Sequence, residues 1–371
     1  MSTTVDEQPW MYPSRIIIVP CPRTASNLFM RMLCIHDQPN AVTADTGGYF
    51  FYPANRHMNL EHLLDRPYQQ WTDEEKEKVR QLYQLGFDKL HETISSAEAA
   101  GKTVVFKEHA LSMIDPVSQC NYIHRRQGES LEEMPWKVHI QELYELGNIP
   151  TLPPTATVLP NEFLAHCFPI CLIRHPALAF PSYCRYVLSY QNKDMSGIQG
   201  VEYSLTRAMT LTWTRGLYDW YMKLWDHLAA AAAPAANQHD VHKLTPKPII
   251  LDADDLITNP EIVIHLCDTV GLDSAKVQFT WDTRDEPMEG MGPSDREIHM
   301  RARTTLYSST GIMPEKSFSG LTVDGEVAKW KVEFGEVDGR KLERWVREAM
   351  SDYEYLWEKR FGGPDRGGVQ K

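Results

Sequence analysis

The chain has 371 residues, 42% of them hydrophobic, and a formal net charge of −12. The apolar content is enough to fill one large α/β domain or two small ones. The acidic balance argues against a general nucleic-acid-binding protein but allows a local basic cleft for a small anion. No apolar run approaches the roughly 20 residues that cross a bilayer, and residues 1–14 do not resemble a secretory signal, so we expect a cytosolic protein without a membrane segment.

Four short runs rich in β-branched residues predict strands that are buried on both faces of a sheet. They are residues 15–20, 103–107, 168–174 and 248–252. Helical patterns separate or follow them, at 24–35, 73–100, 202–232, 259–270 and 339–360. Because strands alternate with helices, we expect an α/β fold with a doubly wound, mostly parallel sheet flanked by helices.

The predicted elements form a single domain over residues 15–362, between flexible tails at 1–14 and 363–371. Residues 116–166 are rich in proline and without a clear pattern. We interpret them as an irregular insertion at the carboxyl edge of the sheet, where lids and substrate loops usually lie.

The cysteines favour a reduced protein without a metal site. Their number is odd, no C-x-x-C pair occurs, and several lie within apolar runs. Cys167 and Cys171 are four residues apart, but no further cysteine or histidine pair lies near them at ligand spacing.

The first strand leads into a loop, Pro22-Arg23-Thr24-Ala25-Ser26-Asn27, that precedes a helix. Backbone amides and the helix dipole at such a turn attract a phosphate or sulfate, and Arg23 adds a full charge. We expect Thr24 or Ser26 to cap the helix, and Ala25 to adopt an ordinary backbone conformation because alanine avoids positive φ. A capped helix start with a surface arginine would give a similar sequence.

This loop is not a Walker A motif, because the G-x-x-x-x-G-K-[ST] pattern is absent. No lysine and hydroxyl pair is therefore placed for a magnesium-bound triphosphate. An enzyme that hydrolyses nucleoside triphosphates is the least favoured of the functions we consider.

Three later segments, together with this loop, resemble the sulfotransferase family in order and rough spacing over residues 15–272. The loop resembles the family's 5′-phosphosulfate loop. Phe106-Lys107-Glu108-His109 looks like its K-x-H motif. Arg174, followed eight positions later by Ser182, is similar to its 3′-phosphate motif. The last segment, Leu251–Leu256 followed by Asn259-Pro260-Glu261, looks like its acidic strand end and next helix.

The resemblance implies a P-loop-like sulfotransferase fold and transfer of a sulfuryl group from PAPS (3′-phosphoadenosine 5′-phosphosulfate) to a hydroxyl of a small-molecule acceptor, with PAP as the product. It also implies the following roles. Arg23, Thr24, Ala25, Ser26 and Asn27 would bind the 5′-phosphosulfate, and Arg174 and Ser182 the 3′-phosphate. Arg23 and Lys107 would stabilise the leaving group without a metal, and His109 would be the general base.

Lys107 and His109 are two residues apart, so on a continuous strand both would point to the same face. An ordinary histidine has a pKa of about 6.5, which suits a base near neutral pH. Side chains at a strand end are also often simply solvated. Arg174 could instead pair with Asp252 or Asp254.

The sequence departs from the family pattern at three places. Ala25 replaces a glycine, and Asn27 replaces a hydroxyl residue but keeps an amide donor. Where cytosolic members have R-K-G before a W-K pair, this chain has Val323-Asp324-Gly325 before Trp330-Lys331. Two cations for the 3′-phosphate are thus missing, and Arg301 or Arg303 could replace them.

These departures motivate a second hypothesis, a non-catalytic or repurposed protein that binds a nucleotide or metabolite on the same fold. The Lys107/His109 pair argues against it, because a binding module needs no base beside the donor site. For Ser182, a helix N-cap after Pro181 is an alternative role. The sequence leaves the acceptor and the oligomeric state open.

Overall fold

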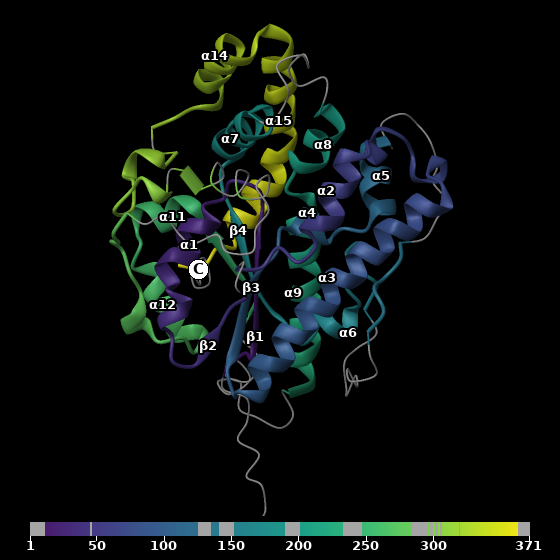
Figure 1. The fold of residues 1–371 in the computed structure, drawn as a ribbon. Coiled ribbons are helices and arrows are strands. Elements are labelled where there is room, and N and C mark those ends of the chain that lie inside the picture. The colour runs from purple at the N-terminus through teal and green to yellow at the C-terminus, as the bar shows by residue number, and fades with distance from the viewer. Residues whose placement is uncertain are drawn as a thin grey trace, which may run out of the picture.

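The structure, a computed structural model, describes residues 12–44, 47–124, 135–140, 152–189, 201–232, 247–283, 296, 300, 303–304, 306–318 and 320–362. Its centre is a parallel sheet of five strands in the order β2-β3-β1-β4-β5 (Figure 1). The strands are β1 (Arg15–Pro20), β2 (Ala41–Val42), β3 (Thr103–Lys107), β4 (Phe168–Ile173) and β5 (Ile249–Asp252). The predicted α/β class and parallel sheet are confirmed. The strand β2 was not predicted, because two residues are too few to give a pattern.

Helices flank the sheet on both sides (Figure 1). They are α1 (Ser26–Leu33), α2 (Tyr52–Leu60), α3 (Asp73–Ala99), α4 (Ala110–Met113), α5 (Pro116–His124), α6 (Asn161–Leu164), α7 (Pro176–Leu188), α8 (Glu202–Ala208), α9 (Thr212–Ala232), α11 (Ala253–Thr258), α12 (Ile262–Val270), α14 (Val323–Phe334) and α15 (Glu336–Trp357).

Alternate residues of β1 serve the two faces of the sheet. Ile17 and Val19 belong to the core that includes α3 and α9, whereas Ile16 and Ile18 pack with residues of α1 and α12. All four side chains are fully buried, because helices cover both faces. Burial on both faces explains why the sequence of β1 is a continuous apolar run.

The strand order places the candidate site at the centre of the sheet. From β1 the chain first builds β2 and β3 on one side, and then adds β4 and β5 on the other. In open α/β sheets, ligands bind beyond the carboxyl ends of the strands, where the strand order reverses. The loop that follows β1 lies at this point.

The helix expected over 202–232 is broken into α8 and α9. The Thr210 hydroxyl accepts a hydrogen bond from the Thr212 amide, and the Trp213 indole donates to the Arg207 carbonyl oxygen. Both contacts replace bonds of a continuous helix. Hydroxyl side chains compete with the helical ladder in this way.

The expectation for residues 116–166 is wrong in one respect. The segment contains the helices α5 and α6, so it is not uniformly irregular. The helix α6 leads into the amino end of β4, away from the carboxyl edge. No described residue of this segment lines the candidate site. Residues 125–134 and 141–151 lie outside the described part of the chain, as do 1–11 and 363–371 of the expected tails.

The loop before α2 is joined to the end of β3 at Lys107. The Tyr49 amide donates to the Lys107 carbonyl oxygen at 2.8 Å, and the Lys107 amide donates to the Gly47 carbonyl oxygen at 3.2 Å. A Cβ on Gly48 would lie 2.0 Å from the Lys107 carbonyl oxygen, and the φ of Gly48 is +125°. Only glycine therefore allows this close approach.

We expect Gly48→Ala to lower the free energy of unfolding by about 3 kcal/mol, because the backbone clash adds to the strain at positive φ. Gly47→Ala is the matched control, since Gly47 also has positive φ but a Cβ there would meet no described atom within 4 Å. It should cost only about 1 kcal/mol. Urea unfolding measures both. Equal losses would show that the contact with Lys107 can relax.

Candidate functional site

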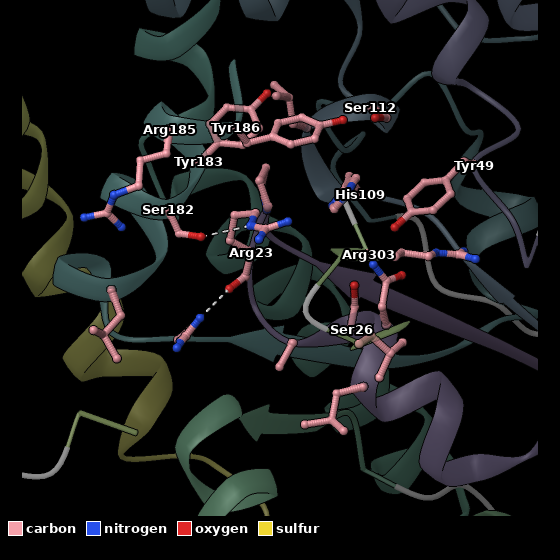
Figure 2. A pocket seen from close by; sticks show the side chains of 18 of the residues that line it. Arg23, Ser26, Tyr49, His109, Ser112, Ser182, Tyr183, Arg185, Tyr186 and Arg303 are labelled. Atoms are coloured by element: carbon pink, nitrogen blue, oxygen red, sulfur yellow. Dashed lines mark hydrogen bonds between the residues drawn. The ribbon is translucent and has the colours of Figure 1, made fainter. Parts of the chain in front are cut away.

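A cavity of about 860 Å³ lies beyond the carboxyl ends of the strands. Its walls come from the loop after β1, the loop before α2, α2 itself, the start of α4, one side of α7, and the segment 303–321, with single residues of α3 and α8 (Figure 2). Most of the side chains predicted for the site line this cavity. They are Arg23, Ala25, Ser26, Asn27, His109, Arg174 and Ser182.

The loop after β1 uses left-handed backbone conformations at two non-glycine residues. The φ angle is 66° at Arg23 and 59° at Ala25. The expectation of an ordinary conformation at Ala25 is therefore wrong. A left-handed alanine costs roughly 1–2 kcal/mol, so the surrounding structure must hold the turn in place.

The start of α1 leaves its first amides available to a ligand. Ala25 occupies the N-cap position without a side-chain cap, so neither Thr24 nor Ser26 caps the helix as expected. The Thr24 hydroxyl instead donates to the Cys21 carbonyl oxygen at 2.8 Å, and Thr24 does not line the cavity. The first amides of a helix have no intrahelical acceptor, and here they open beside Arg23.

Arg23, Arg174 and Ser182 come together although they are far apart in sequence. Figure 2 shows Arg23 beside Ser182. The Arg23 Nε donates to the Ser182 Oγ at 3.0 Å. The Arg174 Nη1 donates to the Arg23 carbonyl oxygen at 3.2 Å, and its Nη2 donates to the Lys316 carbonyl oxygen at 2.6 Å. Burial lowers the pKa of Arg174, and the nearby Arg23 charge adds to this. Two guanidinium groups that repel each other favour a polyanionic ligand.

The structure rules out the alternative roles of Ser182 as a helix N-cap and of Arg174 as a hydrogen-bond partner of Asp252 or Asp254. Ser182 lies within α7, so it is not a helix N-cap. The Nη atoms of Arg174 donate to backbone carbonyl groups and not to Asp252 or Asp254. Asp254 still acts on Arg174 through its charge, and its carboxylate accepts the Phe318 amide.

Lys107 ends β3 and is almost fully buried, at 1% exposure. Its Nζ donates to the Asn27 Oδ1 at 2.6 Å and lies 4.7 Å from the centre of the Tyr49 ring. Lys107 is not among the residues that line the cavity. The structure therefore places its charge beneath the loop, behind Asn27 and Tyr49.

His109 lines the cavity and lies beyond the end of β3, at the N-cap of α4. Strand alternation thus does not relate it to Lys107, contrary to the sequence-based argument. Its Nδ1 lies 3.2 Å from the Pro20 carbonyl oxygen. When Nδ1 carries the proton and donates to Pro20, Nε2 keeps a lone pair that can accept a proton.

Burial and, to a smaller extent, the Lys107 charge lower the pKa of His109 from 6.5 to about 4, against the opposite effect of the Pro20 carbonyl group. The imidazole is therefore neutral at pH 7. A neutral imidazole is the form that a general base requires.

Glu108 and Tyr49 also belong to the site, although the sequence did not predict a role for either. The Glu108 carboxyl group is buried and accepts hydrogen bonds from the amides of Phe51 and His109, and burial raises its pKa to about 8. The Tyr49 ring lies 5.1 Å from the His109 ring and above Lys107. The Gly47-Gly48 pair before Tyr49 was a usable turn signal, whereas nothing in the sequence marks Glu108 as buried.

The segment near the C-terminus contributes Arg303 and Lys316 to the cavity. Arg303 lies close enough to Tyr49 to lower the pKa of that phenol against the larger effect of burial. Val323-Asp324-Gly325 begins α14, where Asp324 pairs with Arg347 of α15 at 2.5 Å. Arg301 lies outside the described residues.

The described residues contain neither a cluster that could hold a metal ion nor a helix that could cross a bilayer. No group of three or more histidine, cysteine, aspartate or glutamate side chains is arranged to hold a metal ion in this part of the chain. Within the same residues, no helix has the length and apolar character needed to cross a bilayer.

Two known proteins that are similar to this chain over almost its whole length are both named sulfotransferases. The chain is 35% identical to "Sulfotransferase ppzF" of Metarhizium rileyi over 358 residues, which cover 96% of this chain and 98% of that protein. It is also 35% identical to "Sulfotransferase ppzF" of Metarhizium majus over 354 residues, 94% of this chain and 97% of the relative. No family model matches the sequence.

A solved structure, the sulfotransferase domain of a Synechococcus olefin synthase, aligns with 86% of this chain and 92% of that domain, at 14% identity and a TM-score of 0.34. That likeness is too loose to support an argument. The two Metarhizium relatives match almost from end to end at 35% identity, and the chain therefore belongs to the sulfotransferase family.

Proposed function

We propose that this protein transfers a sulfuryl group from PAPS to a hydroxyl group of a small-molecule acceptor, with His109 as the general base. The observation that carries the proposal is that His109 and the anion-binding loop with Arg23 line one cavity. A site that only held a nucleotide would have no use for a neutral imidazole beside the donor.

The residues present fit a donor with two phosphate groups. The amides at the start of α1 and the Arg23 guanidinium would hold the 5′-phosphosulfate. Arg174 and Ser182, which contact Arg23, would hold the 3′-phosphate. When bound, PAPS supplies the sulfuryl group and needs no metal for its own activation.

The protein's part in the reaction is to position groups and stabilise charge. Arg23 would stabilise the negative charge that develops on the leaving phosphate. His109 would receive the acceptor's hydroxyl proton on Nε2. Lys107 would contribute through its charge and through Asn27, because its Nζ is buried against that residue.

We expect PAP to raise the thermal midpoint while Mg-ATP raises it much less, because the loop has no Walker lysine. At 100 times its dissociation constant, PAP should add about 2.7 kcal/mol of stability. Differential scanning fluorimetry with matched ligand series measures this. Equal or better stabilisation by Mg-ATP would reject PAPS as the donor. PAP binding without sulfation of any hydroxyl compound would favour the repurposed-protein hypothesis.

We expect Arg174→Ala to raise the KM for the donor at least tenfold and to keep kcat within about tenfold. Arg174 would contact a phosphate group that is present in both the ground and transition states. A modest kcat loss is expected because Arg174 also holds the Arg23 carbonyl group. Steady-state kinetics with the acceptor KM as internal control test this. A kcat loss above 100-fold at saturating donor would place Arg174 at the reacting centre.

A further inference from the structure

Arg207 of α8 is a buried cation whose hydrogen-bond partners are all neutral. Its side chain is 2% exposed. Its Nη1 donates to the Asn55 Oδ1 at 3.1 Å and to the Gln119 Oε1, and its Nη2 donates to the Asn59 Oδ1 at 2.9 Å. The two asparagines lie on α2 and the glutamine on α5. Three amide oxygens fix the guanidinium group but leave its charge uncompensated.

A buried charge without a counter-charge is costly, and arginines are almost never fully buried unless paired. Among the described residues, no carboxylate lies within ion-pairing distance of Arg207. Its Nε finds no hydrogen-bond acceptor among them either. Burial accordingly lowers the pKa of this guanidinium group. The Nε and Nη2 atoms form one edge of the planar fork that binds a carboxylate through two parallel bonds.

Arg207 lines the same cavity as His109, together with Asn55 and Asn59. The Asn55 Nδ2 donates to the carbonyl oxygen of Ser112, which follows His109 in the chain by one turn of α4. Figure 2 shows Ser112 and Tyr183 on the side of the cavity opposite Ser26. Arg207 therefore belongs to the part of the cavity that lies beyond His109 from the donor loop.

The cavity as a whole is lined by cations and aromatic rings. Arg56 and Lys89 also line the cavity, and Glu315 is the one carboxylate among the described lining residues. Arg185 lines it too, but two hydrogen bonds pair it with Glu333. The donor would account for Arg23 and Arg174, so the charge at Arg207 is left for another ligand. Tyr52 and Tyr183 add apolar surface with polar tips.

We propose that the acceptor is a hydroxyl compound that also carries a carboxylate, which Arg207 binds while the hydroxyl group faces His109. This proposal rests on the proposed function for the hydroxyl group. The anion-binding role of Arg207 can be measured without turnover. A purely structural arginine that ties α2, α5 and α8 together would give no preference for an anionic ligand.

The wild-type protein gives the first test. Three phenols of similar size serve as probes: 3-(4-hydroxyphenyl)propanoate, its neutral amide, and the cation tyramine. Calorimetry with PAP present should show at least tenfold tighter binding of the acid than of the amide, and weakest binding of tyramine, as expected for a charge-assisted bidentate pair. PAPS-dependent sulfation, followed by mass spectrometry, should rank kcat/KM in the same order.

Equal binding of the acid and the amide, including no detectable binding of either, would overturn the proposal. PAP binding is measured in the same samples, so the two proposals can fail separately. If PAP binds and phenols are sulfated without preference for the acid, only the carboxylate assignment fails. If PAP does not bind but the acid still binds more tightly than the amide, only the donor assignment fails.

Substitutions test whether Arg207 is the residue that causes the preference for the acid over the amide. Arg207→Gln should reduce the acid-to-amide ratio to within about threefold and leave PAP affinity unchanged, whereas Arg207→Lys should keep part of the preference. Arg185→Gln is the matched control and should keep the full ratio, because the Arg185 charge is already paired with Glu333. A folded Arg207→Gln protein with the full ratio would overturn the assignment. If Arg207→Gln does not fold, the acid-to-amide ratios of Arg207→Lys and of the wild-type protein test the assignment instead.

Discussion

His109→Ala should lose about 10²–10⁴-fold in turnover while its affinity for PAP stays within a few-fold. The imidazole lines the same cavity as the loop after β1, and its Nδ1 lies 3.2 Å from the Pro20 carbonyl oxygen. Removing the ring would take away the proposed base and leave Arg23, Arg174 and Ser182 in place. Turnover comes from steady-state kinetics, and PAP affinity from calorimetry.

The pH dependence should differ from that of an ordinary histidine. The proposed base is the neutral imidazole, and the pKa of His109 is lowered to about 4. Activity should therefore hold from pH 8 down through pH 6.5 and decline only as the pH falls toward that value. A bound anionic donor shifts the decline upward, because negative charge favours the imidazolium ion.

The lowered pKa of His109 also makes the free energy of unfolding depend on pH. The unfolded chain binds this proton near pH 6.5, whereas the folded protein binds it near pH 4. The contribution of His109 to stability is thus fully present above pH 6.5 and is lost as the pH falls from 6.5 to about 4. His109→Ala should remove this part of the pH dependence of unfolding.

His175→Asn is the matched control for the loss of turnover in His109→Ala. Burial also lowers the pKa of His175 to about 4, but this residue caps α7 and stacks on Phe318. Asparagine can keep the cap, so the variant should retain nearly full turnover. Full activity of His109→Ala on a confirmed acceptor would show that another base, or the substrate itself, takes the proton.

Arg23→Ala should lower kcat at saturating donor by about 10²–10³-fold. The Arg23 guanidinium lies at the loop where charge would develop on the leaving group, and its Nε contacts Ser182. The φ at Arg23 is 66°, and alanine adopts a similar φ of 59° at position 25 in the same loop. The substitution therefore tests the side chain with little change in backbone strain. Single-turnover kinetics separate the chemical step from donor binding.

Arg185→Ala is the control for charge in the same cavity. Arg185 pairs with Glu333 at 2.6 Å, so its removal should change kcat by no more than about threefold. Arg23→Lys should recover part of the lost rate, because lysine keeps the charge but not the planar donor fork. A loss confined to the donor KM in Arg23→Ala would mean that Arg23 binds the donor without stabilising the transition state.

The sequence by itself determined the parallel sheet and the candidate donor site. Strands buried on both faces read as continuous apolar runs, as in Arg15–Pro20, whose residues after Arg15 are all buried. Residues that follow the carboxyl ends of neighbouring parallel strands meet at one edge of the sheet. Arg23, His109 and Arg174 each follow such a strand, which is why they could be assigned to one site.

Only the tertiary structure decided how the site is shaped beyond these strand ends. The left-handed turn at Ala25 goes against the preference of alanine, and long-range contacts hold it. The burial of Lys107 behind Asn27 and Tyr49 depends on a loop from another part of the chain. Asn55 lies 152 residues from Arg207 along the chain, yet it holds that guanidinium group beside the cavity. Local sequence patterns cannot predict contacts between such distant residues, because burial and charge compensation arise only when the chain has folded.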